Sequence, residues 1–314
     1  MSEVFAQRTL EKLLGNHHFT VELLSGGVSC DTAKVSWPGS GAVVKRALAQ
    51  LRVPGQWEAD VDRILAEADA IELFRTLTPN NVPGLISRSD EELAIAIELA
   101  AEDMRDWRFA MLAGEVDPEV GATLGRVLAT WHSQTRGVQL PPRIAAGKKR
   151  LFDLRAGAFY GGMANTWPEF APLINELADE LMRSTECAVH GDFSPKNVLH
   201  GPSGTWVLDF EVTHQGAPVF DLAYMSAHLN LKAIKLVSQR ELVAQTLKNF
   251  FESYQEHGGV VPKNISAHAG TIMAVRVVGI SQVNYFVEEE KVLAVQRAKD
   301  LLNGASVIIP SVNR

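Results

Sequence analysis

Short apolar runs separated by turn residues characterise the first hundred residues of the chain. β-Type residues occupy Thr20–Leu24, Thr32–Trp37 and Ala42–Lys45, with glycine or proline-glycine segments between them. Two more runs follow at Gly84–Ile86 and Glu92–Leu99, and the second contains the continuous apolar sequence LAIAI. Such a run is typical of a strand that is buried in a sheet. The pattern therefore predicts a small β-sheet in this part of the chain.

Apolar residues at helical spacing predict two helices that accompany this sheet. Val4–Leu14 has the pattern of a short amphipathic helix. Asp60 is predicted to cap a second helix that runs to about Phe74. The apolar face of that helix is formed by Val61, Ile64, Leu65, Ala68 and Ile71.

Helical patterns dominate most of the remaining chain. Asp117 followed by Pro118 predicts the start of a long buried helix, because proline is favoured in the first helical turn. Residues Pro141–Arg183 predict two helices around an irregular link that end before Cys187. Further helical segments are predicted over Leu222–Leu231, Arg240–His257 and Ala267–Leu302.

The stretch Val189–Asp221 departs from the helical pattern and places polar residues between short apolar runs. The turn Gly201–Gly204, flanked by Val198-Leu199 and Trp206-Val207-Leu208, predicts a β-hairpin. The polar residues are the triplet His190-Gly191-Asp192, Asn197, and the cluster Asp209-Phe210-Glu211. We therefore expect carboxylates and a carboxamide at the ends of buried strands.

Composition narrows the class of protein without identifying a substrate. The 314 residues are 46% hydrophobic and 21% charged, which is ordinary for a globular protein. A formal charge of −7 disfavours a nucleic-acid-binding surface as the main function. Cys30 and Cys187 have no paired spacing, which disfavours a disulfide framework or zinc site. With no signal-peptide or transmembrane pattern, we expect a cytoplasmic monomer or homodimer with no membrane or nucleic-acid partner.

The polar residues of Val189–Asp221 fit the needs of phosphoryl transfer. One carboxylate orients or deprotonates the acceptor hydroxyl, while an asparagine and another carboxylate bind Mg²⁺ on the nucleotide phosphates. The order of these residues matches the catalytic and metal-binding loops of kinases. An aspartate is followed five residues later by an asparagine, and an Asp-Phe-acidic cluster comes after a hairpin. Separate helix-capping or turn roles would explain each residue alone, but their joint spacing favours a kinase.

These motifs also carry a family resemblance. The sequences HGDFSPKN, LDFE and APVFDLAY resemble the aminoglycoside phosphotransferase and choline kinase superfamily. The resemblance implies an α+β, bilobal, protein-kinase-like fold with a small β-rich N-lobe, residues 1–100, and a larger, mainly helical C-lobe, residues 101–314. Residues Glu98–Asp103 would form the hinge between the lobes, and the cofactors would be ATP and Mg²⁺.

The resemblance assigns roles to the residues of the C-lobe. Asp192 would be the catalytic base, and Asn197 and Asp209 would be the Mg²⁺ ligands. Glu211, where protein kinases have glycine, would assist near a second metal. Two residues, His190 and Asp221, would support the catalytic loop. His132, at the end of the helix that starts at Pro118, is also interpreted as structural.

The phosphate-binding side is predicted from the first strands. The loop containing Ser25, Gly26, Gly27 and Ser29 resembles the Ser-Gly-Gly loop of small-molecule kinases, because glycine lets backbone N–H groups approach an anion. Lys45 ends an apolar strand and is expected to contact the α- and β-phosphates. Its expected partner is Glu67, with Glu72 as the alternative. A plain hairpin turn and an exposed strand-end lysine would explain the same local pattern.

A narrower resemblance to methylthioribose kinases concerns the acceptor. It covers VVKRALAQLRV, the tryptophan after it, DRILAEADAI, and the segment that begins at Arg276. It implies that Trp57 lies near the nucleotide and that Arg276 binds the sugar. Trp57 could instead cover a lobe edge, and Arg276 could form a surface ion pair. The predicted substrate is a small-molecule alcohol or sugar, with methylthioribose-like, aminoglycoside, choline and homoserine acceptors all open.

Two other functions are alternatives to a small-molecule kinase. A protein kinase is disfavoured because Ser194 replaces the expected lysine, no long activation segment separates Asp209 from Asp221, and no Ala-Pro-Glu follows. An inactive nucleotide-binding scaffold would be expected to lack at least one of the key side chains. The sequence retains all of them: Lys45, Asp192, Asn197 and Asp209.

Overall fold

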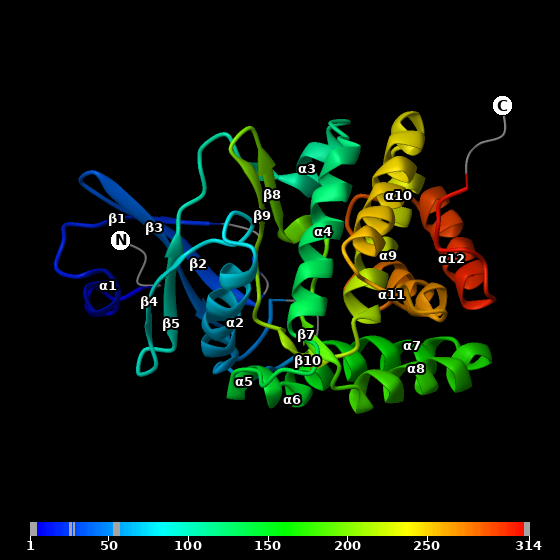
Figure 1. Ribbon diagram of the computed structural model, residues 1–314, viewed down its shortest axis with the longest axis horizontal. Coiled ribbons are helices and arrows are strands. Elements are labelled where there is room, and N and C mark those ends of the chain that lie inside the picture. Colours follow the sequence, from blue (N-terminus) through cyan, green and yellow to red (C-terminus); the bar gives the residue numbers. More distant parts are fainter. Residues whose placement is uncertain (1–4, 25–26, 28, 53–56, 311–314) are drawn as a thin grey trace.

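The computed structural model describes residues 5–24, 27, 29–52 and 57–310. A twisted sheet lies at one end of the molecule and a group of long helices lies at the other (Figure 1). The sheet is built from the first hundred residues, and the helices come from the rest of the chain. The predicted α+β organisation, with a β-rich part followed by a larger helical part, is confirmed.

The sheet is antiparallel and has five strands in the order β1-β2-β3-β5-β4. All five strands were predicted, with boundaries that differ by a few residues. Their bounds are β1 Thr20–Leu23, β2 Cys30–Trp37, β3 Ser40–Ala47, β4 Leu85–Ser89 and β5 Ala94–Glu98. In the centre, Lys45 of β3 pairs with Thr32 of β2 and Ile95 of β5, which places the lysine in the middle of the sheet.

Two helices pack beside the sheet. Helix α1, Gln7–Leu14, contacts β4 and β5, and Lys12 pairs with Glu92 at 2.8 Å. Helix α2, Arg63–Leu77, contacts β3 and β5 on one side and α4 and α5 on the other. This double contact explains why α2 is buried almost all round rather than along a single apolar stripe.

The prediction that Asp60 caps α2 was wrong. The helix starts at Arg63 after Asp62, and the Asp60 carboxylate instead accepts the N–H of Asp62 at 3.3 Å in the preceding turn. Aspartate is common both in caps and in turns, so local composition did not separate the two. The Arg63 side chain makes several tertiary contacts that favour its position at the start of the helix.

The helical part contains the predicted hairpin and several helices. Strands β8 and β9 form the hairpin, β6 adds to it, and β7 pairs with β10. The strand bounds are β6 Arg105–Asp106, β7 Cys187–Val189, β8 Val198–Gly201, β9 Gly204–Val207 and β10 His214–Gly216. The long α-helices are α4 Pro118–Gln134, α8 Ala171–Arg183, α9 Val219–Lys235, α10 Arg240–Glu256, α11 Ile265–Val278 and α12 Glu288–Leu302.

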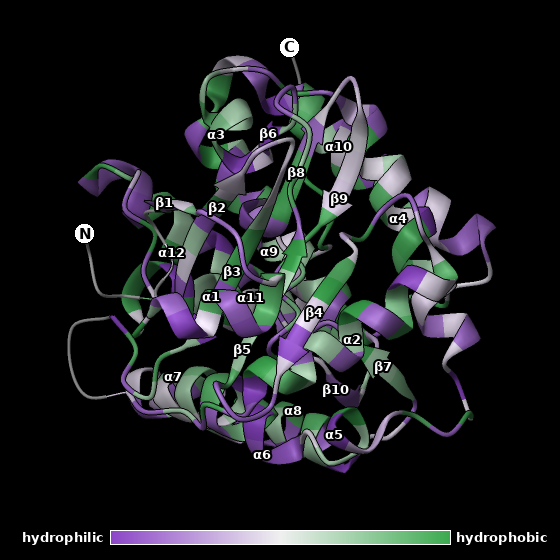
Figure 2. Cartoon of the chain, turned by 90° about the vertical axis from the view of Figure 1, so that its left-hand side faces the viewer, coloured by the Kyte–Doolittle hydropathy of each residue, from purple (hydrophilic) through white to green (hydrophobic). Residues whose placement is uncertain are grey.

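Short helices complete this part of the chain. They are α3 Trp107–Leu112, α5 Pro142–Ala145, α6 Lys148–Leu151, α7 Gly162–Thr166, and the 3-10 turns η2 Pro168–Phe170, η3 Pro195–Asn197 and η4 Val237–Gln239. The π-helix η1 covers Phe152–Gly161. The two helices predicted over Pro141–Arg183 are therefore wrong in number, although α8 ends before Cys187 as expected. Helix α6, with the sequence KKRL, is mostly hydrophilic (Figure 2).

Two predicted features of the long helices are confirmed in detail. Asp117 caps α4, where its carboxylate accepts the N–H of Glu119 at 3.0 Å. The segment Ala267–Leu302 is helical except for a break between α11 and α12 at residues 279–287. Within the described part of the chain, none of the helices has the length and apolar character needed to cross a membrane.

Helices α4 and α10 pack very closely at two glycines. A Cβ atom added to Gly121 would lie 2.1 Å from the carbonyl oxygen of Thr246. A Cβ added to Gly125 would lie 2.2 Å from that of Phe250. Both distances are far below van der Waals contact with backbone atoms that have little freedom to move. The close approach of these helices therefore depends on glycine at both positions.

We expect Gly125→Ala to lower the free energy of unfolding by about 1–3 kcal/mol or more, because the helices must separate to admit the methyl group. Urea denaturation followed by circular dichroism would measure this. Gly161→Ala is the matched control, since its added Cβ meets nothing within 4 Å. Equal stability of the two variants would contradict close packing at Gly125.

Candidate active site

Lys45 joins the two parts of the chain. Its Nζ donates to Glu67 Oε1 of α2 at 2.5 Å and to Asp209 Oδ1 at 2.9 Å. The predicted contact between Lys45 and Glu67 is thus present. Burial raises the pKa of Glu67; the Lys45 ammonium opposes this effect, and the carboxylates of Asp209 and Glu211 add to it. Lys45, Glu67 and Asp209 therefore form one group of interacting charges across the sheet and the helical part.

Asp192 is buried beside two cations. Its Oδ2 lies 2.7 Å from Lys196 Nζ, and its Oδ1 lies 3.2 Å from Arg155 Nη2. Burial alone would raise the pKa of Asp192, but the charges of Lys196 and Arg155 outweigh it and hold the pKa well below its usual range. The carboxylate is consequently ionised at neutral pH, as a residue that orients a hydroxyl requires.

Asn197 is bound to the same loop. Its Nδ2 donates to the main-chain oxygen and to Oδ2 of Asp192, both at 2.9 Å. The loop is also tied to the residues before Asp209, because the N–H of Leu208 donates to the Asn197 main-chain oxygen at 2.8 Å. Asp192 and Asn197 are thereby brought close to Asp209. Burial and the Asp192 charge would raise the pKa of Asp209, but the charges of Lys45 and Lys196 outweigh them and lower it.

His190 and Asp221, which were predicted to support the catalytic loop, both contact backbone groups of the loop that contains Asp192. Asp221 accepts the backbone N–H groups of His190 at 2.7 Å and Gly191 at 2.8 Å. The N–H of Asp192 lies 3.1 Å from His190 Nδ1, so Nε2 carries the proton and donates to the Leu208 carbonyl at 3.0 Å. Gly191 has φ of +81°, a conformation that glycine adopts without strain.

His132, which was predicted to be structural, contacts Asp221 behind this loop. Its Nε2 is 3.2 Å from Asp221 Oδ2, and its Nδ1 is 2.9 Å from the Tyr254 hydroxyl. The chain of contacts runs from α10 through His132 and Asp221 to the backbone around Asp192. Packing of the helices therefore controls the shape of the loop.

The residues predicted to bind Mg²⁺ have oxygen atoms suited to it. The amide nitrogen of Asn197 donates hydrogen bonds to Asp192, and its side-chain carbonyl oxygen makes no hydrogen bond to the described residues. Asp209 contacts Lys45 through one oxygen, and its side chain is 25% exposed. Asp209 also has φ of +69°, which is unusual for a residue other than glycine. Carboxylate and amide oxygens are hard ligands of the type that Mg²⁺ prefers, so these residues fit the ion.

Glu211 makes a buried contact that the sequence did not reveal. Its Oε2 accepts from Arg63 Nε at 2.9 Å and lies 3.4 Å from Cys30 Sγ. Arg63 has no exposed surface and also donates to the carbonyl oxygens of Ser29 at 2.6 Å and Leu48 at 2.8 Å. Arg63 thus joins the phosphate-loop region, α2 and the segment after Asp209.

Only part of the predicted phosphate loop lies within the described residues. Ser25 and Gly26 lie outside them. Gly27 is exposed, and Ser29 is buried with its carbonyl oxygen bound to Arg63. Ser29 directly precedes β2, which begins at Cys30, so this end of the loop lies at the end of β2 that contacts Glu211.

The residues predicted to contact the nucleotide or sugar have different surroundings. Trp57 is buried; its indole N–H donates to the Asp153 carbonyl at 3.0 Å and its ring packs against Phe159. Both contacts of Trp57 are therefore with residues of η1. Arg276, on α11, donates to the Ser281 hydroxyl. It forms no ion pair with a described carboxylate, so the alternative of a surface ion pair for Arg276 is wrong.

Arg63, Arg155 and Lys196 are the site residues that sequence reasoning missed. Lys196 lies inside the HGDFSPKN motif, four residues after Asp192, and its position within a functional loop was a signal that could have identified it. Arg155 lies in the π-helix η1, in the segment with no clear pattern, and donates to the Gly191 carbonyl at 2.9 Å. Arg63 looks like an ordinary charged residue at a helix start. Only the fold brings Arg63 and Arg155 to the site.

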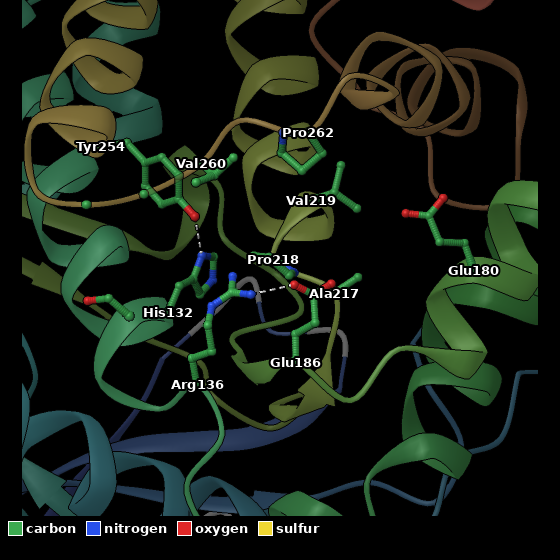
Figure 3. Close-up of a pocket in the computed structure, with 13 residues that line it drawn as sticks. His132, Arg136, Glu180, Glu186, Ala217, Pro218, Val219, Tyr254, Val260 and Pro262 are labelled. Carbon is green, nitrogen blue, oxygen red and sulfur yellow. Dashed lines mark hydrogen bonds and ion pairs between the residues drawn. The ribbon is translucent and has the colours of Figure 1, made fainter.

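A separate cavity of about 580 Å³ lies near His132 (Figure 3). In Figure 3 His132 and the Tyr254 hydroxyl face one another, and Arg136 reaches toward Glu186. The lining includes His132 but none of Lys45, Asp192 or Asp209. This cavity is therefore distinct from the group of residues predicted to act on phosphate.

Solved structures with similar architecture establish the fold. The choline kinase LicA from Streptococcus pneumoniae aligns with a TM-score of 0.57 at 16% identity, covering 95% of this chain and 98% of that one. The amicoumacin kinase hAmiN in complex with AMP-PNP, Ca²⁺ and Ami also aligns with a TM-score of 0.57, at 12% identity, covering 97% and 96%. The predicted bilobal, kinase-like fold is thus confirmed.

Sequence comparisons agree with this fold. Methylthioribose kinase from Bacillus cereus (strain G9842) is 25% identical over 229 residues, which cover 64% of this chain and 58% of that protein. The chain thus spans less than two thirds of the length of the curated relatives it matches. A family model described as the phosphotransferase enzyme family matches residues 20–257, which is most of the chain. This protein therefore belongs to the phosphotransferase enzyme family.

Proposed function

We propose that this protein is an ATP-dependent phosphotransferase that phosphorylates a hydroxyl group of a small molecule. The observation that carries the proposal is the convergence of Lys45, Asp192, Asn197 and Asp209 from both parts of the chain. Family membership supports the reaction class. A structure with this fold contains AMP-PNP, which supports ATP as the phosphoryl donor.

Each residue has a role in this reaction. Asp192 orients the acceptor hydroxyl and takes its proton as the hydroxyl oxygen bonds to the γ-phosphorus and the bond to ADP breaks. Lys45 contacts the α- and β-phosphates, and Glu67 positions Lys45. Ser25, Gly26, Gly27 and Ser29 contribute backbone N–H groups to the phosphates. Most of the rate acceleration comes from positioning and preorganised charge.

Asn197 and Asp209 are the proposed Mg²⁺ ligands. Bound Mg²⁺ would neutralise negative charge on the phosphate oxygens. Glu211 contacts Arg63 through one oxygen and would assist the metal group through the other. His190 and Asp221 keep the catalytic loop in shape through contacts to its backbone.

The two lobes divide this work. We assign residues 1–100 to the N-lobe, which supplies Lys45 and Glu67, and residues 101–314 to the C-lobe, which supplies Asp192, Asn197 and Asp209. The sheet ends at Glu98 and the next helical segment begins at Trp107, which supports a boundary between them. Trp57 then stabilises the contact between the lobes rather than the nucleotide.

The proposed acceptor is a sugar-like alcohol. The similarity to methylthioribose kinases supports a methylthioribose-like sugar, with aminoglycoside, choline and homoserine-type alcohols as the alternatives. Arg276 is retained as an acceptor-binding residue because it forms no ion pair with a described carboxylate.

Release of ADP from Mg·ATP, measured with the full chain over a panel of sugars, amino alcohols and aminoglycosides, tests the function. We expect acceptor-dependent ADP release with at least one class, and a Lys45→Met variant that raises the KM for ATP and lowers kcat. Retention of ATP binding together with no release for any acceptor would instead favour an inactive nucleotide-binding scaffold.

A further inference from the structure

One face of α9 carries polar side chains that begin near Asp192 and continue along the helix. Tyr224, His228 and Lys232 are spaced by four residues, so they lie along the same side of the helix. Tyr224 is at the Asp192 end, because Arg155, which pairs with Asp192 at 3.2 Å, lies 5.7 Å from the centre of the Tyr224 ring. The His228 ring stacks on Tyr224 at 5.3 Å. Lys232 is eight residues beyond Tyr224, about 12 Å along the helix axis.

Positive charges gather at the Lys232 end of this face. Lys232 is 1% exposed, and its Nζ lies 3.9 Å from the centre of the Tyr285 ring, with no ion pair to a described carboxylate. Arg276 comes from α11, which packs against α9, and Arg108 comes from α3. The charges of both arginines act on Lys232. Figure 1 shows α9 and α11 side by side in the helical part.

We call this set the cationic cluster: Arg108, Tyr224, His228, Lys232, Arg276 and Tyr285. Asp106, which pairs with Arg108 at 2.7 Å, is the carboxylate in contact with it among the described residues. Its charge is too small to balance Arg108, Lys232 and Arg276 together. Burying an ammonium group without a charged partner is costly, so this excess of positive charge needs an explanation.

Several buried polar atoms of the cationic cluster also have no hydrogen-bond partner. They are Nε of Arg108, Nε of Arg276, Nε2 of His228 and the hydroxyl of Tyr285. The His228 side chain is 5% exposed. Most buried polar atoms in proteins are paired, and an anion would accept hydrogen bonds from these donors. Burial, with Arg108 and Arg276 nearby, also lowers the pKa of Lys232 to about 7, which a bound anion would reverse.

We propose that the cationic cluster binds an anionic group of the acceptor, a carboxylate or a phosphate ester, while the acceptor hydroxyl lies at Asp192. This inference rests on the proposed kinase function and names the class of its substrate: a sugar-like alcohol that carries a negative charge at a distance from the hydroxyl that is phosphorylated. A cationic acceptor, such as an aminoglycoside or an amino alcohol, would be repelled by the same residues.

The experiment compares charged sugar derivatives with related neutral sugars. The probes are gluconate against glucose, and ribose 5-phosphate against ribose, so that the carboxylate and phosphate sources are separated. Binding to the full chain is measured by calorimetry without ATP, and turnover is measured by ADP release with Mg·ATP. The variants are Lys232→Met and Arg276→Met. Lys235→Met is the matched control, because Lys235 lies on the same helix but pairs with Glu290 at 3.0 Å.

We expect at least one anionic probe to bind, and each cluster variant to weaken that binding by about 10–100-fold, the range for losing a charge-assisted hydrogen bond. Binding of the anionic probe should be unchanged in Lys235→Met. Binding of the neutral sugars should be unchanged in the cluster variants. Lys232→Met removes a buried unpaired charge, so we expect the variant to fold and to be at least as stable as the wild type, which a thermal melt would verify.

Gluconate binding should also depend on pH through Lys232. The groups that face it are His228 on the same helix, Arg108 and Asp106 beside α3, Arg276 on α11, and Tyr285. Because the pKa of Lys232 is lowered to about 7, its ammonium is lost as the pH rises through 7. We therefore expect gluconate affinity to fall from pH 7 to pH 9 in the wild type and this dependence to vanish in Lys232→Met.

The outcomes separate this inference from the proposed function. Cluster-dependent binding of an anion without ADP release for any acceptor would support the anion site and count against the kinase. Failure of the wild type to bind either anionic probe would overturn the anion site, as would turnover of neutral or cationic acceptors that is unchanged in Lys232→Met and Arg276→Met.

Discussion

Replacement of Asp192 by asparagine is expected to lower kcat by about 10²–10⁴-fold, the usual contribution of a positioned acid or base. The introduced carboxamide would retain the size of the side chain but would neither accept the hydroxyl proton nor balance the charges of Lys196 and Arg155, which contact Asp192 at 2.7 and 3.2 Å. ADP release at saturating ATP and acceptor measures the loss. The KM for ATP should change little, because Lys45 contacts Asp209 and Glu67 rather than Asp192.

Asp179→Asn provides the control for this substitution. Asp179 is an exposed aspartate of α8 whose side chain is 72% accessible, 3.9 Å from Arg183, and its loss should leave kcat unchanged. Turnover by Asp192→Asn at the wild-type rate would remove Asp192 from the mechanism. The pKa of Asp192 is held well below its usual range, so the residue is ionised at all pH values above that range. We therefore expect Asp192 to produce no fall in kcat between pH 8 and pH 5.

Arg63→Met is expected to lower the free energy of unfolding by about 3–5 kcal/mol, the range for removing one partner of a buried ion pair. Arg63 has no exposed surface, and the substitution leaves the buried carboxylate of Glu211 without its partner at 2.9 Å. The carbonyl oxygens of Ser29 and Leu48 would lose their donor as well. Chemical denaturation in urea, with fluorescence as the probe, measures the change.

A double variant and a surface-arginine variant serve as controls for Arg63→Met. Arg63→Met combined with Glu211→Met should recover part of the lost stability, because no unpaired charge then remains buried. Arg183→Met removes an arginine that is 71% exposed and should have no measurable effect. A single Arg63→Met variant as stable as the wild type would show that this buried pair contributes nothing to joining the lobes.

Arg63 also explains why the start of α2 differs from the start predicted from sequence. The apolar spacing of Ile64, Leu65, Ala68 and Ile71 correctly predicted a helix that buries each of these residues. The cap was assigned to Asp60 because capping preferences depend on residue type, and both Asp60 and Asp62 satisfy them. The helix start is decided by contacts of Arg63 with Ser29, Leu48 and Glu211, none of which is adjacent in the sequence.

The segment Pro141–Arg183 could not be resolved from its pattern for a related reason. It folds into short helical pieces and a π-helix, Phe152–Gly161, whose backbone period is not that of an α-helix. Periodicity analysis looks for one repeat over many residues. Arg155 was therefore not recognised, although it lies beside Asp192.

The sequence by itself determined the sheet, the long helices, the hairpin and the spacing of Asp192, Asn197 and Asp209, because strand alternation, helical periodicity and turn chemistry act between residues close along the chain. Tertiary structure alone decided that Lys45 contacts Asp209, 164 residues away, that Arg63 contacts Glu211, 148 residues away, and that the cationic cluster forms. The partner of a buried charge depends on which segments the whole core brings together, and no local pattern encodes that choice.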